Sequence, residues 1–454
     1  MSIDQPSHVV AILGGACAGS AAAELLAESG CEVVVFDQNA RPYGKIEDGL
    51  PRWHDKQRRM EYEKINVRLD RDGVTYVPCT RLGADIDFRD IATGWGFSAV
   101  ILANGAWKDR PLEIPGAALE ESRGLVYQNP LIYWFNHRDE AGYDGPHYRI
   151  ADRTVVIGGG LASIDVIKIV QLDLYAHALA AHGIKADVIE MEHHGIPRFL
   201  AAHGIDDPAS VGVQPGVLVY RRRIADMPLA PIPADATQAQ LAKAESVREK
   251  ILKKCQDRFL FDVRAQTLPV ALRRENDSLV GLDVRSTRVD GRRALPVEGT
   301  EETLPADLVI SSIGSVPEPI PGIEMDGVYY RFADESTGAY VPIPGVFGVG
   351  NVITGQGNIK VSHDHGRQIA RSLIEGYLGI GETEDRDVSG ATEMATSRGA
   401  SLARAVDSHL AAGTPLSVES ARALIERARS RQREVGFTST YRDWIAANTP
   451  ADMI

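Results

Sequence analysis

Near the start of the chain the sequence reads His8-Val-Val-Ala-Ile-Leu13, then Gly14-Gly15-Ala16-Cys17-Ala18-Gly19, and, after an alanine-rich segment, Cys31-Glu-Val-Val-Val-Phe-Asp37. The first and last of these runs are apolar enough for buried strands, and residues 20–30 between them predict a helix. A strand, a tight glycine turn, a helix and a second strand form the βαβ unit of a Rossmann-type domain. The sequence therefore predicts an α/β fold with a dinucleotide at this turn.

The residues of the first turn have separate roles in such a site. Gly14 permits the tight turn, and the helix that follows directs free N–H groups at a pyrophosphate. Gly19 allows close packing of helix and strand, whereas Ala16 replaces the usual second glycine and displaces the pyrophosphate slightly outward. Asp37 can accept hydrogen bonds from a ribose. The candidate contacts for the first dinucleotide are Gly14, Gly15, Ala16, Cys17, Ala18, Gly19, Asp37 and Gln38.

The same pattern recurs 144 residues later, counted from Gly14 to Gly158. Arg153-Thr-Val-Val-Ile157 predicts a strand, and an amphipathic helix is expected from Ile164 onward. The turn between them is Gly158-Gly159-Gly160-Leu161-Ala162-Ser163, which aligns with the first turn without gaps. Ser163 replaces the third glycine and is expected to loosen the packing of helix and strand slightly. Two such turns predict two bound dinucleotides and redox chemistry between them.

Composition excludes several other classes of protein. A chain of 454 residues, 44% hydrophobic and 24% charged, is typical of a globular protein with two or three domains. The net charge of −13 argues against nucleic-acid binding. No apolar run reaches the roughly 18 residues of a membrane span, and residues 1–8 lack the features of a secretory signal. We therefore expect no membrane span and a cytoplasmic protein.

The cysteines and histidines predict no metal site. Cys17, Cys31, Cys79 and Cys255 contain no Cys-x-x-Cys pair and no spacing for zinc or an iron–sulfur cluster. They are expected to be reduced thiols in the core. His193-His194 and the pair His363 and His365 lack a third ligand at suitable spacing, although either of the latter two could touch the edge of a bound cofactor.

Further motifs lie between and beyond the turns. They are Arg41-Pro-Tyr-Gly44-Lys45 with Gly49-Leu-Pro51, Asp72 to Val77, Ala103-Asn104-Gly105, Asp307 to Gly314, Gly350-Asn351, and Gly357-Asn358-Ile359. Together they resemble the flavoprotein family of adrenodoxin-type ferredoxin–NADP reductases and the glutamate synthase small subunit, from about Val9 to Gly379. The resemblance implies that FAD lies on the first turn. It also implies that Arg41, Gly44, Lys45, Val77 and residues 103–105 line the FAD site, that Gly350 and Asn351 contact its ribityl chain, and that residues 357–359 open a helix facing the flavin. In this family, threonine and aspartate stand where this chain has Asn104 and Asn351.

A basic strand end bears on the second cofactor. Val219-Tyr-Arg221-Arg222-Arg223, followed by Met227-Pro228, resembles the family segment whose arginine meets the 2′-phosphate of NADP. A competing second strand is Ala186 to Glu192, within an insertion of about residues 181–216. If that segment were the strand, Glu190 would bind a ribose hydroxyl and favour NADH. We favour the arginine strand and NADPH, with NAD as the alternative.

The predicted architecture has two Rossmann-like domains. A discontinuous FAD domain spans 1–150 and 319–380, an inserted NADP(H) domain spans 151–318, and a helical C-terminal extension spans 381–454, in which Ser417 is a candidate helix cap. The extension could be a lid, a dimer arm or a docking segment. The run from Arg52 to Arg59 could dock an acidic partner or be a solvated helix face.

The predicted function is hydride transfer from NADPH to FAD, followed by electron transfer to a ferredoxin-like protein or a partner subunit. No catalytic side chain is predicted, because the cofactors carry the chemistry. One alternative is a flavoenzyme that reduces or oxygenates its own small-molecule substrate. The other is a flavin-binding subunit with a structural or regulatory role. Assembly into a homo-oligomer stays open.

Overall fold

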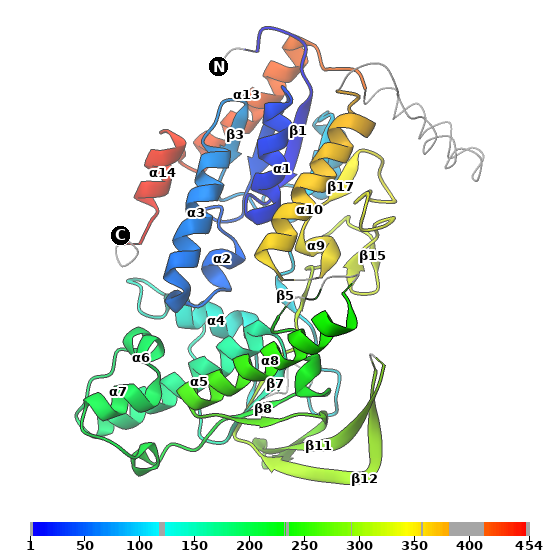
Figure 1. Ribbon diagram of the computed structural model, residues 1–454. Coiled ribbons are helices and arrows are strands. Elements are labelled where there is room, and N and C mark those ends of the chain that lie inside the picture. Colours follow the sequence, from blue (N-terminus) through cyan, green and yellow to red (C-terminus); the bar gives the residue numbers. More distant parts are fainter. Residues whose placement is uncertain are drawn as a thin grey trace. The chain divides into compact units, whose positions relative to one another are not determined.

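The structure is a computed structural model (Figure 1) that describes residues 3–117, 123–230, 232, 236–291, 293–355, 357–380 and 413–450. The chain divides into two compact units. The first unit comprises Met1–Glu47, Lys56–Lys108 and Ser315–Ile454, and the second comprises Asp48–Asp55 and Asp109–Gly314. The first boundary thus falls near residue 108 rather than at the expected 150. The reason is long-range pairing, because strand β6 (Leu125–Tyr127) hydrogen-bonds to β13 (Leu308–Ser312) in the sheet of the second unit.

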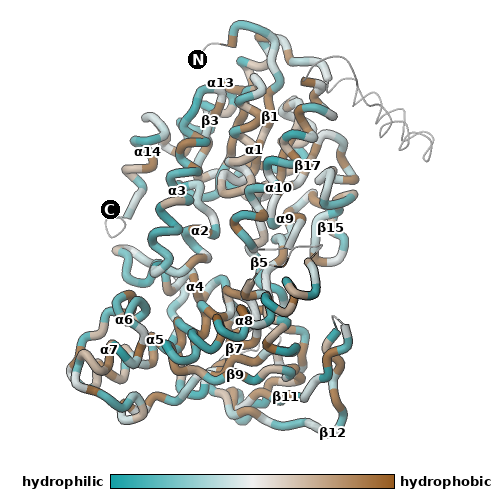
Figure 2. The backbone as a smooth tube through the Cα atoms, in the orientation of Figure 1, coloured by the Kyte–Doolittle hydropathy of each residue, from teal (hydrophilic) through white to brown (hydrophobic). Residues whose placement is uncertain are grey.

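The first unit is built on a five-stranded parallel sheet in the order β17-β4-β1-β2-β3. Its strands are β1 (Val9–Leu13), β2 (Glu32–Phe36), β3 (Val74–Val77), β4 (Ala99–Leu102) and β17 (Val346–Gly348). Since successive side chains of a strand point to opposite faces, β1 contributes to two separate hydrophobic clusters. Val10 and Ile12 pack with α1 (Cys17–Glu28) and α10 (Ile359–Ser372) on one face. Figure 2 shows the hydrophobic residues gathered along β1 and α1.

The opposite face of this sheet is covered by the C-terminal part of the chain. Val9, Ala11 and Leu13 share a cluster with four buried residues of α13 (Val418–Glu434). The predicted N-cap is confirmed, because Ser417 Oγ accepts a hydrogen bond from the Ser420 N–H. The other elements of this region are α2 (Lys45–Asp48), α3 (Asp55–Leu69), η2 (Asp90–Gly94), β5 (Lys108–Asp109), β14 (Ser315–Val316), β15 (Met325–Asp326), β16 (Tyr329–Tyr330), α9 (Asn351–Thr354), η6 (Leu373–Tyr377) and α14 (Tyr441–Ala447).

The second unit repeats the parallel architecture. Its five-stranded sheet has the order β6-β13-β7-β8-β9, with β7 (Thr154–Gly158), β8 (Val217–Val219) and β9 (Asp262–Arg264). The helices are α4 (Gln128–His137), α5 (Leu161–Ala181) and α8 (Gln238–Phe259), and η1 (Arg52–His54) and η5 (Ile224–Asp226) are short 3₁₀ turns. A separate antiparallel sheet joins β10 (Thr267–Glu275), β11 (Ser278–Asp290) and β12 (Arg293–Pro305). The prediction of two Rossmann-like sheets in an α/β fold is confirmed.

The insertion at 181–216 is helical. It contains α6 (Val188–His194), α7 (Ile196–Ala202) and the 3₁₀ turn η4 (Pro208–Val211). The alternative that Ala186 to Glu192 forms the second strand is wrong. Asp187 caps α6 by accepting hydrogen bonds from the N–H groups of Ile189 and Glu190, so Glu190 lies in the first turn of a helix. The second strand is β8, which pairs in parallel with β7.

The predicted lack of a membrane span agrees with the helices of the described ranges, none of which is both long and apolar enough to cross a bilayer.

Candidate functional site

The first glycine turn can be built only with glycine at two of its positions. Gly14 has φ = +111°, and a Cβ there would lie 2.5 Å from the Ala103 carbonyl oxygen. A Cβ on Gly19 would lie 1.8 Å from the Gly14 carbonyl oxygen. Ala16 is different, because its φ of −71° and ψ of −152° are open to any L-residue. The alanine therefore causes no backbone strain, and its methyl group affects only what lies beside the turn.

Helix α1 begins directly at this turn with unsatisfied donors. Its N-cap, Ala16, offers no side-chain hydrogen bond, and the first turn contains no acidic residue. The backbone N–H groups at the start of a helix lack intrahelical acceptors and lie at the positive end of the helix dipole. A pyrophosphate supplies the acceptor oxygens and the negative charge that this arrangement lacks.

Asp37 lies beside the same turn. Its buried carboxylate accepts a hydrogen bond from the Gly15 N–H at 2.8 Å and another from the Asn39 N–H at 2.9 Å. These two amides fix the carboxylate at the carboxyl end of β2. A carboxylate at this place in a Rossmann-type fold can also accept hydrogen bonds from ribose hydroxyls.

The other predicted FAD contacts gather at the same edge of the sheet. Val77 ends β3, residues 103–105 follow β4, Gly350 and Asn351 follow β17, and residues 357–359 lead into α10. Ligands of open α/β sheets bind outside the carboxyl ends of the strands. The buried Oδ1 atoms of Asn104 and Asn351 accept no hydrogen bond from the described residues. Buried acceptors of this kind are rare, and a ligand with hydroxyl groups would satisfy them.

Two of the predicted basic contacts are used within the protein. Arg41 is buried and forms an ion pair with Glu47. Lys45 donates a hydrogen bond to Ser315 Oγ at 3.0 Å and lies 5.8 Å from the centre of the Trp107 ring. Gly44 has φ = +50° and places the chain close to Ala16. This segment therefore shapes the wall beside the turn, with Arg41 as an internal support.

In the second turn, Gly160 faces open space, whereas Gly159 is packed against a side chain. A Cβ on Gly159 would lie 2.3 Å from the Tyr220 ring, whereas a Cβ on Gly160 would meet nothing within 4 Å. Gly160 is also the N-cap of α5, which has no side-chain cap. The protein itself therefore does not require glycine at position 160, and the lack of a methyl group there would let a pyrophosphate approach this turn more closely than it can approach Ala16 in the first turn. Leu161, the first residue of α5, is 58% exposed beside this opening and is followed by Ala162.

Ser163 corrects the expectation of loosened packing. The residue is buried, and its Oγ donates a hydrogen bond to the Ser312 carbonyl oxygen at 3.0 Å. The hydroxyl thus ties α5 to the end of β13. Gly314, two residues further along, has φ = +101° and ends the segment predicted to lead back to the first unit.

The three arginines after β8 are not equivalent. Arg223 forms a bidentate ion pair with Asp226, and Arg222 donates hydrogen bonds to Tyr220 Oη and to the Asp226 carbonyl oxygen. The exposed side chain of Arg221 makes no such bond with any residue in the described ranges. Arg221 is therefore the guanidinium most available for an added phosphate.

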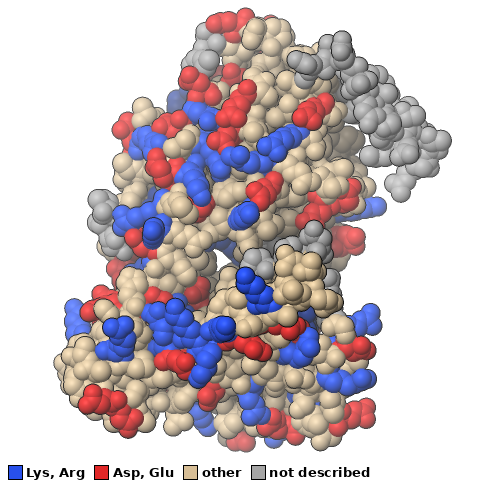
Figure 3. Space-filling model, in the orientation of Figure 1, with Lys and Arg blue, Asp and Glu red and all other residues tan. Residues whose placement is uncertain are grey.

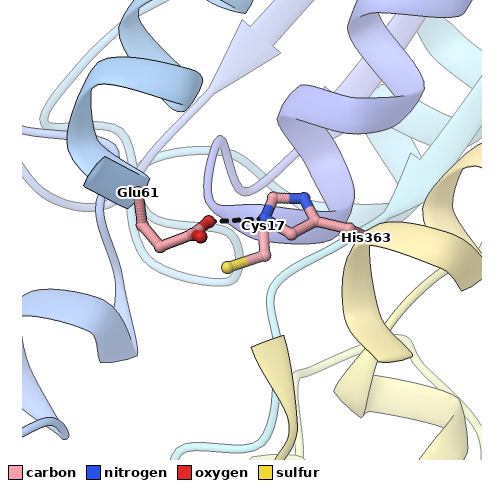
Figure 4. A group of neighbouring side chains, drawn as sticks. All are labelled: Cys17, Glu61 and His363. Carbon is pink, nitrogen blue, oxygen red and sulfur yellow. Dashed lines mark hydrogen bonds and ion pairs between the residues drawn. The ribbon is translucent and has the colours of Figure 1, made fainter. Parts of the chain in front are cut away.

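Behind the first turn, three helices contribute a buried cluster that the sequence did not predict (Figure 4). His363 Nε2 lies 2.7 Å from Glu61 Oε2, and Cys17 Sγ lies near both. Arg68 donates to His363 Nδ1 at 2.9 Å, so Nε2 carries the imidazole proton and donates it to Glu61. Burial lowers the pKa of His363. Burial alone would raise the pKa of Glu61, but hydrogen bonds from Lys64 and His363 lower it.

This hydrogen bonding argues against a metal at the cluster. A metal bound at His363 Nε2 would need the lone pair that the Arg68 contact assigns to Nδ1. Burial also raises the pKa of the Cys17 thiol to about 12, so this sulfur is a protonated side chain rather than a thiolate. The cluster instead joins α1, α3 and α10 around the turn. Sequence spacing could not reveal it, because its members are more than 40 residues apart.

His365 also has a backbone role. Its Nδ1 accepts a hydrogen bond from the Gly350 N–H, and its Nε2 lies 2.8 Å from the Glu335 carbonyl oxygen. Both ring nitrogens are thus engaged in holding the turn that carries Asn351. A contact between its ring carbons and a flavin stays a prediction.

The run from Arg52 to Arg59 is only partly exposed, and docking of a partner on it stays a prediction. Trp53 and Arg58 are buried, and Arg52 pairs with Asp139. His54 Nε2 lies 3.1 Å from a carboxylate oxygen of Asp165 on α5. The run turns inward because Trp53 belongs to the core of the second unit. Figure 3 shows basic and acidic side chains interspersed over the face drawn.

Comparison with known proteins also singles out the part of the chain that contains the two glycine turns. The sequence profile described as "Pyridine nucleotide-disulphide oxidoreductase" matches residues 8–201, which include both glycine turns. The chain is similar to this family over that segment, which is less than half of its length.

One relative is the putative glutamate synthase [NADPH] small chain of Cereibacter sphaeroides, which is 26% identical over 82% of this chain and 77% of that protein. The mitochondrial NADPH:adrenodoxin oxidoreductase of Arabidopsis thaliana is 23% identical over 71% of this chain and 70% of its own length. The structure of Mycobacterium tuberculosis FprA in complex with NADPH matches with a TM-score of 0.65 and 19% identity, covering 94% of this chain and 91% of that one. This likeness confirms the fold.

The name of the matching family mentions disulphides, but the four cysteines of this chain are free. Cys17 and Cys31 are buried, and Cys79 and Cys255 are half-buried. Burial raises the pKa of each of these thiols. The raised pKa values keep these thiols protonated near neutral pH.

Proposed function

We propose that this chain is an FAD-dependent oxidoreductase that accepts a hydride from NADPH and passes electrons to a ferredoxin-like protein or partner subunit. FAD would lie at the first turn, in the unit built on β1, and NADPH at the second turn, in the unit built on β7. When bound, FAD supplies the chemistry that converts a two-electron hydride into single electrons.

The observation that carries the proposal is the pair of uncapped helix starts. Helices α1 and α5 each follow the first strand of a parallel βαβ unit, and neither has a side-chain cap. A helix start at this position accepts a pyrophosphate. Two such sites in one chain favour two dinucleotides, and the relatives named for NADPH oxidoreduction support the same assignment.

The chain's own residues would bind and orient the two cofactors rather than transfer protons. In the first unit, Asp37 would hold the adenosine ribose, and Asn351 would hold a hydroxyl of the ribityl chain. In the second unit, Gly160 would admit the pyrophosphate, and Arg221 would pair with the 2′-phosphate and so favour NADPH over NADH. Orientation of this kind suits hydride transfer, whose rate depends on the alignment of the two rings.

An electron-transfer protein is the proposed acceptor, since the relatives include an adrenodoxin oxidoreductase and glutamate synthase small chains. The identity of this acceptor and the cytoplasmic location stay predictions. The two alternatives, a flavoenzyme with its own small substrate and a flavin-binding regulatory subunit, are separated by the same experiment as the proposal.

The experiment is an anaerobic titration of the purified protein, followed by visible spectroscopy. Wild-type protein is expected to carry the flavin spectrum, to be bleached by NADPH more readily than by NADH, and to pass electrons to ferricyanide and to a ferredoxin. A colourless protein that FAD cannot reconstitute would overturn the proposal. Reoxidation by one small organic compound but by no ferredoxin would favour the first alternative. A bound flavin that neither nicotinamide reduces would favour the second.

A further inference from the structure

The C-terminal segment, residues 413–450, packs against the first unit through two helices. Leu416 forms an isolated β-bridge with Ser7, which leads into β1. Ala421 and Ala428 of α13 are fully buried in the cluster that includes strands β1 and β2, and Tyr441 and Ile445 of α14 are buried in the other cluster of this unit. The segment is therefore part of the core of this unit.

Helix α13 contacts the loop that follows β3. Gln432 Nε2 donates to the Tyr76 carbonyl oxygen at 2.5 Å, and Arg431 donates to Thr80 Oγ1 at 3.1 Å and to the Cys79 carbonyl oxygen at 3.4 Å. Cys79 has φ = +50°, a left-handed conformation that is strained for a residue with a Cβ. Contacts from α13 thus add to the hydrogen bonds that this loop makes from the Cys79 and Thr80 N–H groups to the carbonyl oxygens of Asn39 and Asp37.

Helix α14 contacts the loop that follows β2. Trp444 Nε1 donates to the Ala40 carbonyl oxygen at 2.7 Å, and Tyr76 Oη donates to the same oxygen from another side at 3.2 Å. Tyr441 Oη and Tyr43 Oη both donate to Asn66 Oδ1, at 2.9 and 3.0 Å. A residue of the segment and a residue of the loop thus share one acceptor.

These two loops flank Asp37, because β2 and β3 are adjacent parallel strands that pair Phe36 with Val77. The carboxyl ends of such strands border the adenosine half of a bound dinucleotide. We propose that residues 413–450 form a clamp that positions both loops for the adenosine end of FAD, with Trp444 and Tyr441 as positioning residues. The inference rests on the proposed binding of FAD at the first turn.

Three conservative variants of the full chain test this clamp. Trp444→Phe and Tyr441→Phe each remove one hydrogen-bond donor and keep a ring of similar size. Arg433→Gln is the matched control, since Arg433 pairs with Glu426 of its own helix. The measurements are the FAD dissociation constant from reconstitution, the NADPH dissociation constant, and the thermal midpoint of the FAD-free protein.

The clamp predicts a rise in the FAD dissociation constant of about fivefold for each variant, equivalent to about 1 kcal/mol per hydrogen bond. The double variant should be weaker still, while the control and the NADPH constant stay unchanged. A lower thermal midpoint with unchanged FAD affinity would mean a merely structural role and would overturn the clamp. Wild-type protein that binds no FAD would instead overturn the proposed function itself.

Discussion

The sharpest test of the second site is the substitution Gly160→Ala. Gly160 has φ = −88° and ψ = 175°, which alanine adopts without strain, and a Cβ built there meets no atom within 4 Å. The fold therefore tolerates the added methyl group. A pyrophosphate bound against the start of α5 would be held further from the backbone N–H groups, as is expected beside Ala16 in the first turn, because the methyl group occupies the space through which its oxygens approach.

The magnitudes for stability and binding have opposite signs. Gly→Ala at a compatible backbone conformation stabilises a protein by about 0.4–1 kcal/mol, since the unfolded chain loses freedom. Forcing an extra methyl group against a bound ligand costs about 1–3 kcal/mol, by analogy with overpacking in a core. That cost corresponds to a rise of roughly 5- to 150-fold in the Michaelis constant for NADPH.

The assay is steady-state ferricyanide reduction at varied NADPH, together with thermal unfolding. Gly159→Ala is the matched comparison, because its methyl group would collide with the Tyr220 ring at 2.3 Å and lower the stability of the fold by about 1–3 kcal/mol. An unchanged Michaelis constant for NADPH in Gly160→Ala would refute the assignment of the pyrophosphate to this turn. A lower thermal midpoint of Gly160→Ala would refute the inference that the space beside Gly160 is open in the folded protein.

Ala16→Gly should lower the dissociation constant of FAD about fivefold, equivalent to about 1 kcal/mol, because it removes the methyl group beside the first turn; equilibrium titration with FAD checks this. Arg221→Ala should raise the Michaelis constant for NADPH about 10- to 150-fold and leave that for NADH unchanged, whereas Arg223→Ala, whose partner is Asp226, should change neither greatly. Burial lowers the pKa of His363 below the unfolded value of about 6.5, so its contribution to stability is present above about pH 6.5 and is lost as the pH falls through the folded value. Thermal midpoints should therefore fall with acidification in wild-type protein, and equal slopes for wild type and His363→Gln would contradict this.

Much of the fold could be read from local sequence. A glycine turn between an apolar strand and a helix is defined by backbone conformation, so Gly14 and its counterpart Gly158 mark both sites without any long-range knowledge. The strand before Arg221 was also predictable, since Val217–Val219 is apolar and ends in basic residues. The segment Ala186 to Glu192 stayed open as an alternative strand because a short apolar run with acidic residues has no clear period. The structure shows a helix there, capped by Asp187.

The residues that the sequence misjudged or missed are those set by contacts between distant segments. Arg41 pairs with Glu47 inside the protein, and Ser163 finds an acceptor on β13 that lies about 150 residues away in the chain. Glu61 and Arg68 meet His363 only because α3 and α10 pack beside α1. A polar side chain shows no local preference for one partner over another, so its partner depends on the packing.

The sequence by itself determined that this chain has two dinucleotide turns in an α/β fold, because glycine, β-branched and acidic residues at fixed spacing satisfy local requirements of the backbone. Only the tertiary structure decided that the buried Oδ1 atoms of Asn104 and Asn351 accept no hydrogen bond within the described part of the chain, and that Gly160 rather than Gly159 faces open space. It also decided that residues 413–450 contact β3 and the loops beside Asp37. These features depend on which surfaces are brought together and buried. Burial is a property of the whole packed chain rather than of any one segment of it.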